Sequence, residues 1–202
     1  MEPTPLHDIL AFLSKPAWFT FVYWLLLLAS VAIALLVWHR VQDQRTPRSV
    51  AIWGLRVLVG TMWWQQTLWK IPPDFAGLRY WMEQQVEHAS LALQSAFVRD
   101  IVLPNLAVFG PLVYLVELLI AVSLLIGVCS RGGSLLGAAM GLNLWLGLYS
   151  APGEWPWTYM FLIIIQALFV IDPPGRSLGI DAMARLRLSS HNRHAARLSW
   201  VT

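Results

Sequence analysis

Apolar residues gather into five long stretches along the chain, and polar or turn-forming residues separate them. A helix needs about 20 apolar residues to cross the roughly 30 Å hydrocarbon core of a bilayer. The pattern therefore predicts five membrane-spanning helices, the last two of them short and separated by the Pro- and Gly-containing turn APGEWPW. The predicted spans are residues 17–38, 50–69, 106–128, 134–150 and 156–171.

Two further segments have the periodicity of surface helices. In the segment 71–105, apolar residues recur every three or four positions, at Leu78, Met82, Val86, Ala89, Leu93 and Phe97. This spacing predicts one amphipathic helix on the outer surface, with Asp74 as its cap. The tail 181–200 is predicted to be a second, basic amphipathic helix, which suits an anionic inner leaflet.

The basic residues flanking the predicted spans indicate their orientation. With the N-terminus outside, the inner side holds nine of them: Arg40, Arg45, Arg48, Arg131, Arg176, Arg185, Arg187, Arg193 and Arg197. The outer side then holds four: Lys15, Lys70, Arg79 and Arg99. This asymmetry predicts a multi-pass protein with its N-terminus outside and its C-terminus in the cytoplasm.

Composition supports a membrane protein and excludes several other classes. The 202-residue chain is 57% apolar and 12% charged, whereas a soluble domain carries about 25% charge. A soluble globular fold, a disordered chain and a nucleic-acid binder are therefore excluded. With Cys129 as the one cysteine, no intrachain disulfide can form. The five histidines lack metal-ligand spacing, so no metal site is expected.

Two charged residues lie inside predicted spans, where a charge is costly and usually faces the interior of a helix bundle. At 1.5 Å per residue, Arg56 lies about 9 Å and Glu117 about 16 Å from the inner ends of their helices. The difference is within reach of an arginine side chain, so we expect an Arg56–Glu117 ion pair. This pair is either a structural clasp or part of a polar site for a quinone head group, a proton or another ligand.

Other polar and aromatic residues share the helix face of Arg56. Trp63, Gln66 and Lys70 follow it at helical spacing towards the outer surface. Tyr114, three residues before Glu117, is placed to form a hydrogen bond with it or with a ligand. Individually, Lys70 fits snorkelling to the interface and Trp63 fits an aromatic belt. Together they form a candidate site.

A stripe of small residues in the fourth predicted span indicates close helix packing. Gly133, Gly137 and Gly141 repeat at intervals of four. The contact is either inside the bundle or with a second protein. Asn143, in the same span, is expected to form an interhelical hydrogen bond.

Three segments resemble the DoxX/DoxD family: LRVLVGTMWWQQTLWKIPPDF (55–75), LVELLIAVSLLIGVCSRGG (115–133) and PPGRSLGIDAMARLR (173–187). The DoxD branch is known as the small subunit of thiosulfate:quinone oxidoreductase. The family core has four membrane helices, the first with an Arg near its inner end and a Lys at its outer end. Arg56 and Lys70 match these positions, and Glu117 matches the acidic residue of the second core helix. Gly175, Arg176, Gly179 and Asp181 match the tail motif.

The sequence departs from the family pattern in two places. The helix predicted at 17–38 lies outside the four-helix core. Gln65 and Gln66 occupy a region where the family often has a polar or histidine position, which argues against a histidine-based proton relay.

The fold expected is an all-α membrane protein: a DoxX-like four-helix transmembrane bundle, one extra N-terminal transmembrane helix and an outer amphipathic helix. We divide the chain into an N-terminal helix with a basic inner loop (1–49), the four-helix membrane domain (50–182) and a basic cytoplasmic tail (183–202).

The function expected is that of an integral subunit of a quinone-linked electron-transfer assembly in a bacterial or archaeal plasma membrane. Its quinone or proton site would comprise Arg56, Trp63, Gln66, Lys70, Tyr114 and Glu117. No catalytic residue and no covalently bound cofactor is assigned to this chain, so electrons would come from a partner subunit. The partners expected are the lipid bilayer and another subunit or a second copy. The alternative is a non-enzymatic membrane anchor, assembly factor or small-solute permease with a structural Arg–Glu clasp.

Overall fold

The computed structural model describes residues 10–11, 13–14, 17–70 and 75–189, and all regular structure within them is helical. Each of the five apolar segments forms a helix close to its predicted bounds. These helices are α2 (Trp18–Arg40), α3 (Pro47–Thr67), α6 (Leu106–Ile126), α7 (Ser130–Gly147) and α8 (Pro156–Ile171). The all-helical class is therefore confirmed for the described residues.

Within the described part of the chain, two helices are long and apolar enough to cross a membrane by length and composition. They are α2, with 23 residues, and α6, with 21. Helix α8 is apolar but has only 16 residues. Helix α3 has the length, but Arg56, Gln65 and Gln66 make it more polar. The five-span topology therefore stays a prediction.

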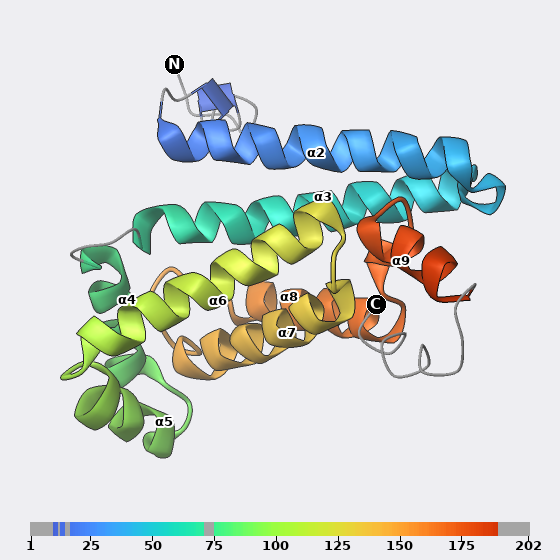
Figure 1. Ribbon diagram of the computed structural model, residues 1–202. Helices are drawn as coiled ribbons and strands as arrows, with labels where there is room; N and C mark the ends of the chain where they lie inside the picture. The colour runs from blue at the N-terminus through green and yellow to red at the C-terminus, as the bar shows by residue number, and fades with distance from the viewer. Residues whose placement is uncertain (1–9, 12, 15–16, 71–74, 190–202) are drawn as a thin grey trace.

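Helices α3, α6, α7 and α8 pack in sequence order, with α6 in contact with both α3 and α7, and α7 against α8 (Figure 1). Helix α2 lies along α3 and also contacts α6. The α2–α3 contact is polar as well as apolar: the hydroxyl groups of Tyr23 and Thr61 lie 2.9 Å apart, and Trp53 Nε1 donates to Ser30 Oγ at 3.2 Å. The main core, which includes Trp63 and Trp64, fills the space between these helices.

The predicted single helix over 71–105 is wrong, because the segment forms three short pieces at one end of the bundle (Figure 1). They are α4 (Ala76–His88), α5 (Ala92–Phe97) and the π-helical turn η3 (Val98–Val102). Between α4 and α5 the backbone is extended, and Ser90 N donates to the carbonyl oxygen of Leu146 on α7 at 2.8 Å. This tertiary hydrogen bond replaces one that a continuous helix would make.

The predicted apolar stripe of this segment is not buried along its whole length. Leu78 and Met82 are buried against Phe75 and Leu106, whereas Leu93 is 82% exposed. The predicted cap Asp74 lies outside the described residues. Phe75, with φ of 50°, precedes α4 instead.

The opposite end of the bundle is rich in arginine, including Arg48, Arg131, Arg176 and Arg185, and we refer to it as the arginine end. It contains η1 (Gln42–Gln44), η4 (Pro174–Arg176) and α9 (Ile180–Ser189). The predicted tail helix over 181–200 is described only as far as Ser189. Helix α9 packs on the C-terminal end of α2 through Ala182 and Val37, so the first long helix and the last described helix are in contact.

Asp181 fastens α9 to the start of α7. Its carboxylate accepts hydrogen bonds from Cys129 N at 2.8 Å, Ser130 N at 2.9 Å and Ser130 Oγ at 2.7 Å. The backbone of Asp181 donates to Gly127 O at 2.9 Å. Gly175 must be glycine here, because a Cβ atom would lie 2.3 Å from Asp181 Oδ2.

Candidate functional site

A cavity of about 670 Å³ lies between α3, α4, α6, α7 and α8, on the side of the bundle that α4 covers. Most of its wall is apolar and includes Met62, Leu78, Met82, Val102, Met140 and Leu162. Its polar residues include Gln66, Lys70, Gln85, Glu117, Asn143, Glu154 and Tyr159. A largely apolar wall with a few polar groups is typical of sites for small organic ligands.

A buried ion pair forms part of this wall. Lys70 Nζ, in the 3₁₀ turn η2 (Leu68–Lys70) that follows α3, donates to Glu117 Oε1 on α6. The two residues are only 3% and 1% exposed. Burial in a low-dielectric region strengthens the attraction between the two charges, but each loses its hydration. The pair therefore holds the end of α3 against the middle of α6.

The expected Arg56–Glu117 ion pair is wrong. Arg56 is fully buried, but its Nη1 donates to the carbonyl oxygens of Leu124 and of Leu125, the latter at 3.0 Å. The antiparallel helices place Arg56 level with the end of α6. Glu117 lies eight residues before Leu125, which is about 12 Å along the helix. Arg56 thus caps the last turn of α6, where positive charge is favourable.

Two buried polar atoms in residues that line the cavity have no hydrogen-bond partner within the described structure. One is Glu117 Oε2 and the other is Trp63 Nε1, and both residues are 1% exposed. Buried polar groups almost always have a partner, in the protein, in water or in a ligand. These two atoms are an unpaired acceptor and an unpaired donor in residues that line the cavity.

A second polar pair borders the same cavity. The hydroxyl of Tyr159 on α8 donates to Glu154 Oε2 at 2.7 Å. Asn143 also lines the cavity and accepts from Gln94 Nε2 of α5, at 3.0 Å through its carbonyl oxygen and at 3.1 Å through Oδ1. Glu154 and Tyr159 are not among the site residues predicted from the sequence. The sequence feature that could have indicated them is an acidic residue, Glu154, in an otherwise apolar turn, with a tyrosine five residues later.

The structure brings four of the six predicted site residues together: Trp63, Gln66, Lys70 and Glu117 all line the cavity. The other two do not line it. Arg56 lies at the end of α6, and Tyr114 packs against the apolar cluster that contains Leu78 and Met82.

The predicted glycine stripe lies within the bundle. A Cβ atom on Gly133 would be 2.3 Å from Ser123 Oγ of α6, and one on Gly137 would be 2.5 Å from Gln166 Nε2 of α8. A Cβ atom on Gly141 would be 3.1 Å from Ile163 Cγ1 of α8. The three glycines therefore allow α7 to lie close to both α6 and α8.

Among the described residues, no group of three His, Cys, Asp or Glu side chains could hold a metal ion. Comparisons with protein-family models, with curated proteins and with solved structures found no match to this chain. An apolar molecule with an oxygen-bearing head group would match the apolar wall of the cavity and its polar residues.

Proposed function

We propose that this chain is an integral membrane subunit of a quinone-linked electron-transfer assembly and binds the quinone in the cavity beside Lys70 and Glu117. The observation that carries the proposal is the pair of unpartnered atoms, Glu117 Oε2 and Trp63 Nε1, in the wall of an apolar cavity. The resemblance of the segments around Lys70 and Glu117 to DoxX/DoxD proteins, including a thiosulfate:quinone oxidoreductase subunit, supports the same function.

The residues present fit both redox forms of a quinone. A quinone supplies the two-electron, two-proton chemistry, and its carbonyl oxygens accept hydrogen bonds. Trp63 Nε1 is a donor for such an oxygen, while Glu117 Oε2 accepts from a quinol hydroxyl. The cavity volume of about 670 Å³ lies within the usual range for ligand pockets.

The acidic residues of the cavity suit proton transfer. Glu117, which Lys70 holds in the cavity wall, is a carboxyl group that can exchange a proton with a ligand oxygen. Glu154, hydrogen-bonded to Tyr159, borders the same cavity and offers a second carboxylate. Under this proposal electrons reach the quinone from a partner subunit, and Glu117 passes a proton from Oε2 to the oxygen of the reduced quinone. The second expected partner is the lipid bilayer.

The membrane topology belongs to the same proposal. The arginine end faces the cytoplasm of a bacterial or archaeal cell, and the α4 side faces outwards. The two long apolar helices, α2 and α6, and the concentration of arginine at one end support this orientation.

Binding of ubiquinone or menaquinone to the purified protein in lipid nanodiscs tests the proposal. We expect Glu117→Gln and Trp63→Phe each to weaken binding by roughly tenfold, because the first replaces a carboxyl group by an amide that cannot exchange a proton and the second removes the indole N–H donor. Glu83→Gln is the matched control, since Glu83 is an exposed acid on α4 outside the cavity. Unchanged affinity in both cavity variants, with folding intact, would overturn the quinone site.

A second function follows if the Lys70–Glu117 pair is only a clasp. The pair joins the end of α3 to the middle of α6 without any ligand. Such a purely structural role fits a membrane anchor or an assembly factor. In that case the cavity variants would lower the abundance of the protein and of its partner without changing quinone binding.

A further inference from the structure

A second cavity, of about 410 Å³, lies at the arginine end and shares no lining residue with the cavity beside Lys70. Its walls come from the α2–α3 turn, the start of α3, the end of α8 and helix α9. Three of its lining residues are arginines: Arg48, Arg176 and Arg185. The quinone proposal uses none of them.

Positive charge is crowded around this cavity. Burial lowers the pKa of the Arg176 guanidinium, and the charges of Arg185 and Arg131 lower it further, while Asp172 and Asp181 act in the opposite direction. Arg185 and Arg131 therefore act on Arg176 as repelling like charges. An added anion would relieve this repulsion.

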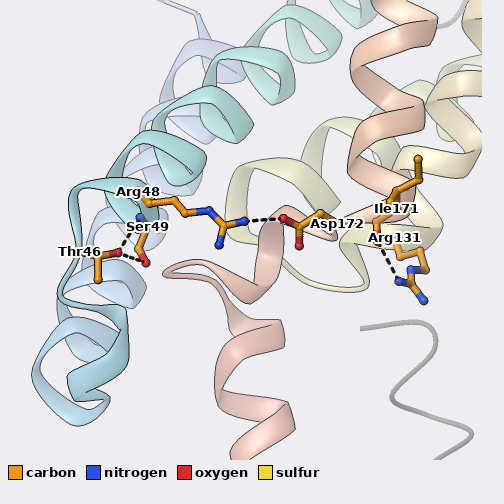
Figure 2. A network of polar contacts seen from close by, with 6 residues as sticks. All are labelled: Thr46, Arg48, Ser49, Arg131, Ile171 and Asp172. Atoms are coloured by element: carbon orange, nitrogen blue, oxygen red, sulfur yellow. Dashed lines mark hydrogen bonds and ion pairs between the residues drawn. The ribbon is translucent and has the colours of Figure 1, made fainter.

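The nearby acidic residues either form a weak, exposed ion pair or already accept hydrogen bonds from other groups. Arg48 Nη2 donates to Asp172 Oδ2 at 3.1 Å, but these side chains are 78% and 61% exposed, so the pair adds little stability (Figure 2). Asp181 accepts three hydrogen bonds from Cys129 and Ser130. Asp43 is the remaining acid in the lining.

Hydroxyl groups complete the wall. Thr46 and Ser49, whose oxygen atoms lie 2.9 Å apart, stand beside Arg48 at the start of α3 (Figure 2). Ser177 follows Arg176 on the opposite wall. Guanidinium forks combined with hydroxyl donors match the oxygen atoms of a phosphate group better than those of a single carboxylate.

We propose that the arginine-end cavity is a binding site for a phosphate group, held by Arg48, Arg176 and Arg185 with help from Thr46, Ser49 and Ser177. An anionic phospholipid head group and a free phosphate or phosphorylated small molecule share this chemistry. The location beside the ends of α2 and α8 favours the phospholipid, because lipid phosphates lie at that level when these helices enter a bilayer.

The test measures thermal unfolding of the full chain in neutral detergent. One sample contains phosphatidylglycerol in the micelles, and a second contains phosphatidylcholine. A third sample contains millimolar inorganic phosphate and is compared with a sample that contains sodium chloride at the same ionic strength. A ligand that binds only the folded protein raises the melting temperature. We expect a rise of several degrees with phosphatidylglycerol beyond that with phosphatidylcholine. We expect Arg185→Gln to reduce that rise and the double variant Arg176→Gln/Arg185→Gln to abolish it.

Arg79→Gln is the matched control, because it removes one exposed arginine from α4 at the other end of the molecule. It should keep the full phosphatidylglycerol effect. A rise with inorganic phosphate that the double variant loses would support the site with a soluble phosphate as its ligand. If neither phosphate source shifts the wild-type melting temperature, or if the double variant retains the shift, the site is overturned and the arginines serve only to orient the chain. Native mass spectrometry of Arg185→Gln, an exposed position, provides a second readout of bound lipid should the double variant fail to fold.

Discussion

Lys70 and Glu117 form a buried ion pair that joins the end of α3 to the middle of α6. Each side chain would be an uncompensated buried charge without the other. The pair is therefore both a constraint on the helix packing and the most polar part of the cavity wall. These two roles can be separated by comparing stability with ligand binding.

The first prediction concerns the stability that depends on this pair. Lys70→Met or Glu117→Leu alone should lower the free energy of unfolding by about 3–5 kcal/mol, because one buried charge is left unpaired. The double variant should lose clearly less than the sum of the two, since it leaves no charge behind. Reversible unfolding in mixed micelles measures all four proteins. Additive losses would show that the two charges do not interact.

The position of Glu117 could be predicted from sequence, but its partner could not. A lone acid in an apolar helix indicates a residue that faces the bundle interior. Which cation reaches it depends on how α3 and α6 are aligned. That alignment is set by the close approach of Gly60 to Leu125, where a Cβ atom would lie 3.0 Å from the backbone nitrogen. The pattern of apolar and polar residues does not reveal how two helices are aligned against each other.

The ends of the helices could also be predicted where they depend on local sequence, but not where they depend on a tertiary contact. The five apolar helices end near their predicted bounds because charged residues, prolines and glycines mark the ends locally. The break between α4 and α5 depends on Ser90 N binding Leu146 O, 56 residues further along the chain. The sequence pattern of Leu78, Met82 and Leu93 continues through the break and gives no sign of it.

The second prediction concerns Asp181, which fastens α9 to α7. Asp181→Ala should lower the free energy of unfolding by about 2–4 kcal/mol, because the N–H groups of Cys129 and Ser130 lose their acceptor in a buried region. Asp172→Ala is the control, since it breaks an exposed pair with Arg48 and should cost about 0–1 kcal/mol. Equal effects of the two substitutions would contradict the role assigned to Asp181.

The third prediction uses two glycines in different surroundings. Gly137→Ala should lower the free energy of unfolding by about 1–3 kcal/mol, because its Cβ atom would lie 2.5 Å from Gln166 Nε2. Gly54→Ala should raise it by about 0.5–1 kcal/mol, because no atom lies within 4 Å and alanine favours a helix. Thermal unfolding of the two variants should give shifts of opposite sign. A stable Gly137→Ala protein would show that α7 and α8 are not packed this closely.

The fourth prediction concerns Gln166, which is fully buried on α8 against Gly137. Both Nε2 and Oε1 lack a hydrogen-bond partner within the described structure. An unpaired buried amide is unfavourable, whereas a methionine of similar length keeps the packing without the polar atoms. Gln166→Met should therefore raise the free energy of unfolding by about 1–2 kcal/mol, measured by thermal unfolding in detergent. Gln65→Met is the control, because Gln65 is an exposed amide on α3 and its replacement should leave stability nearly unchanged. Destabilisation by Gln166→Met alone would mean that this amide binds a water molecule or a ligand between α7 and α8.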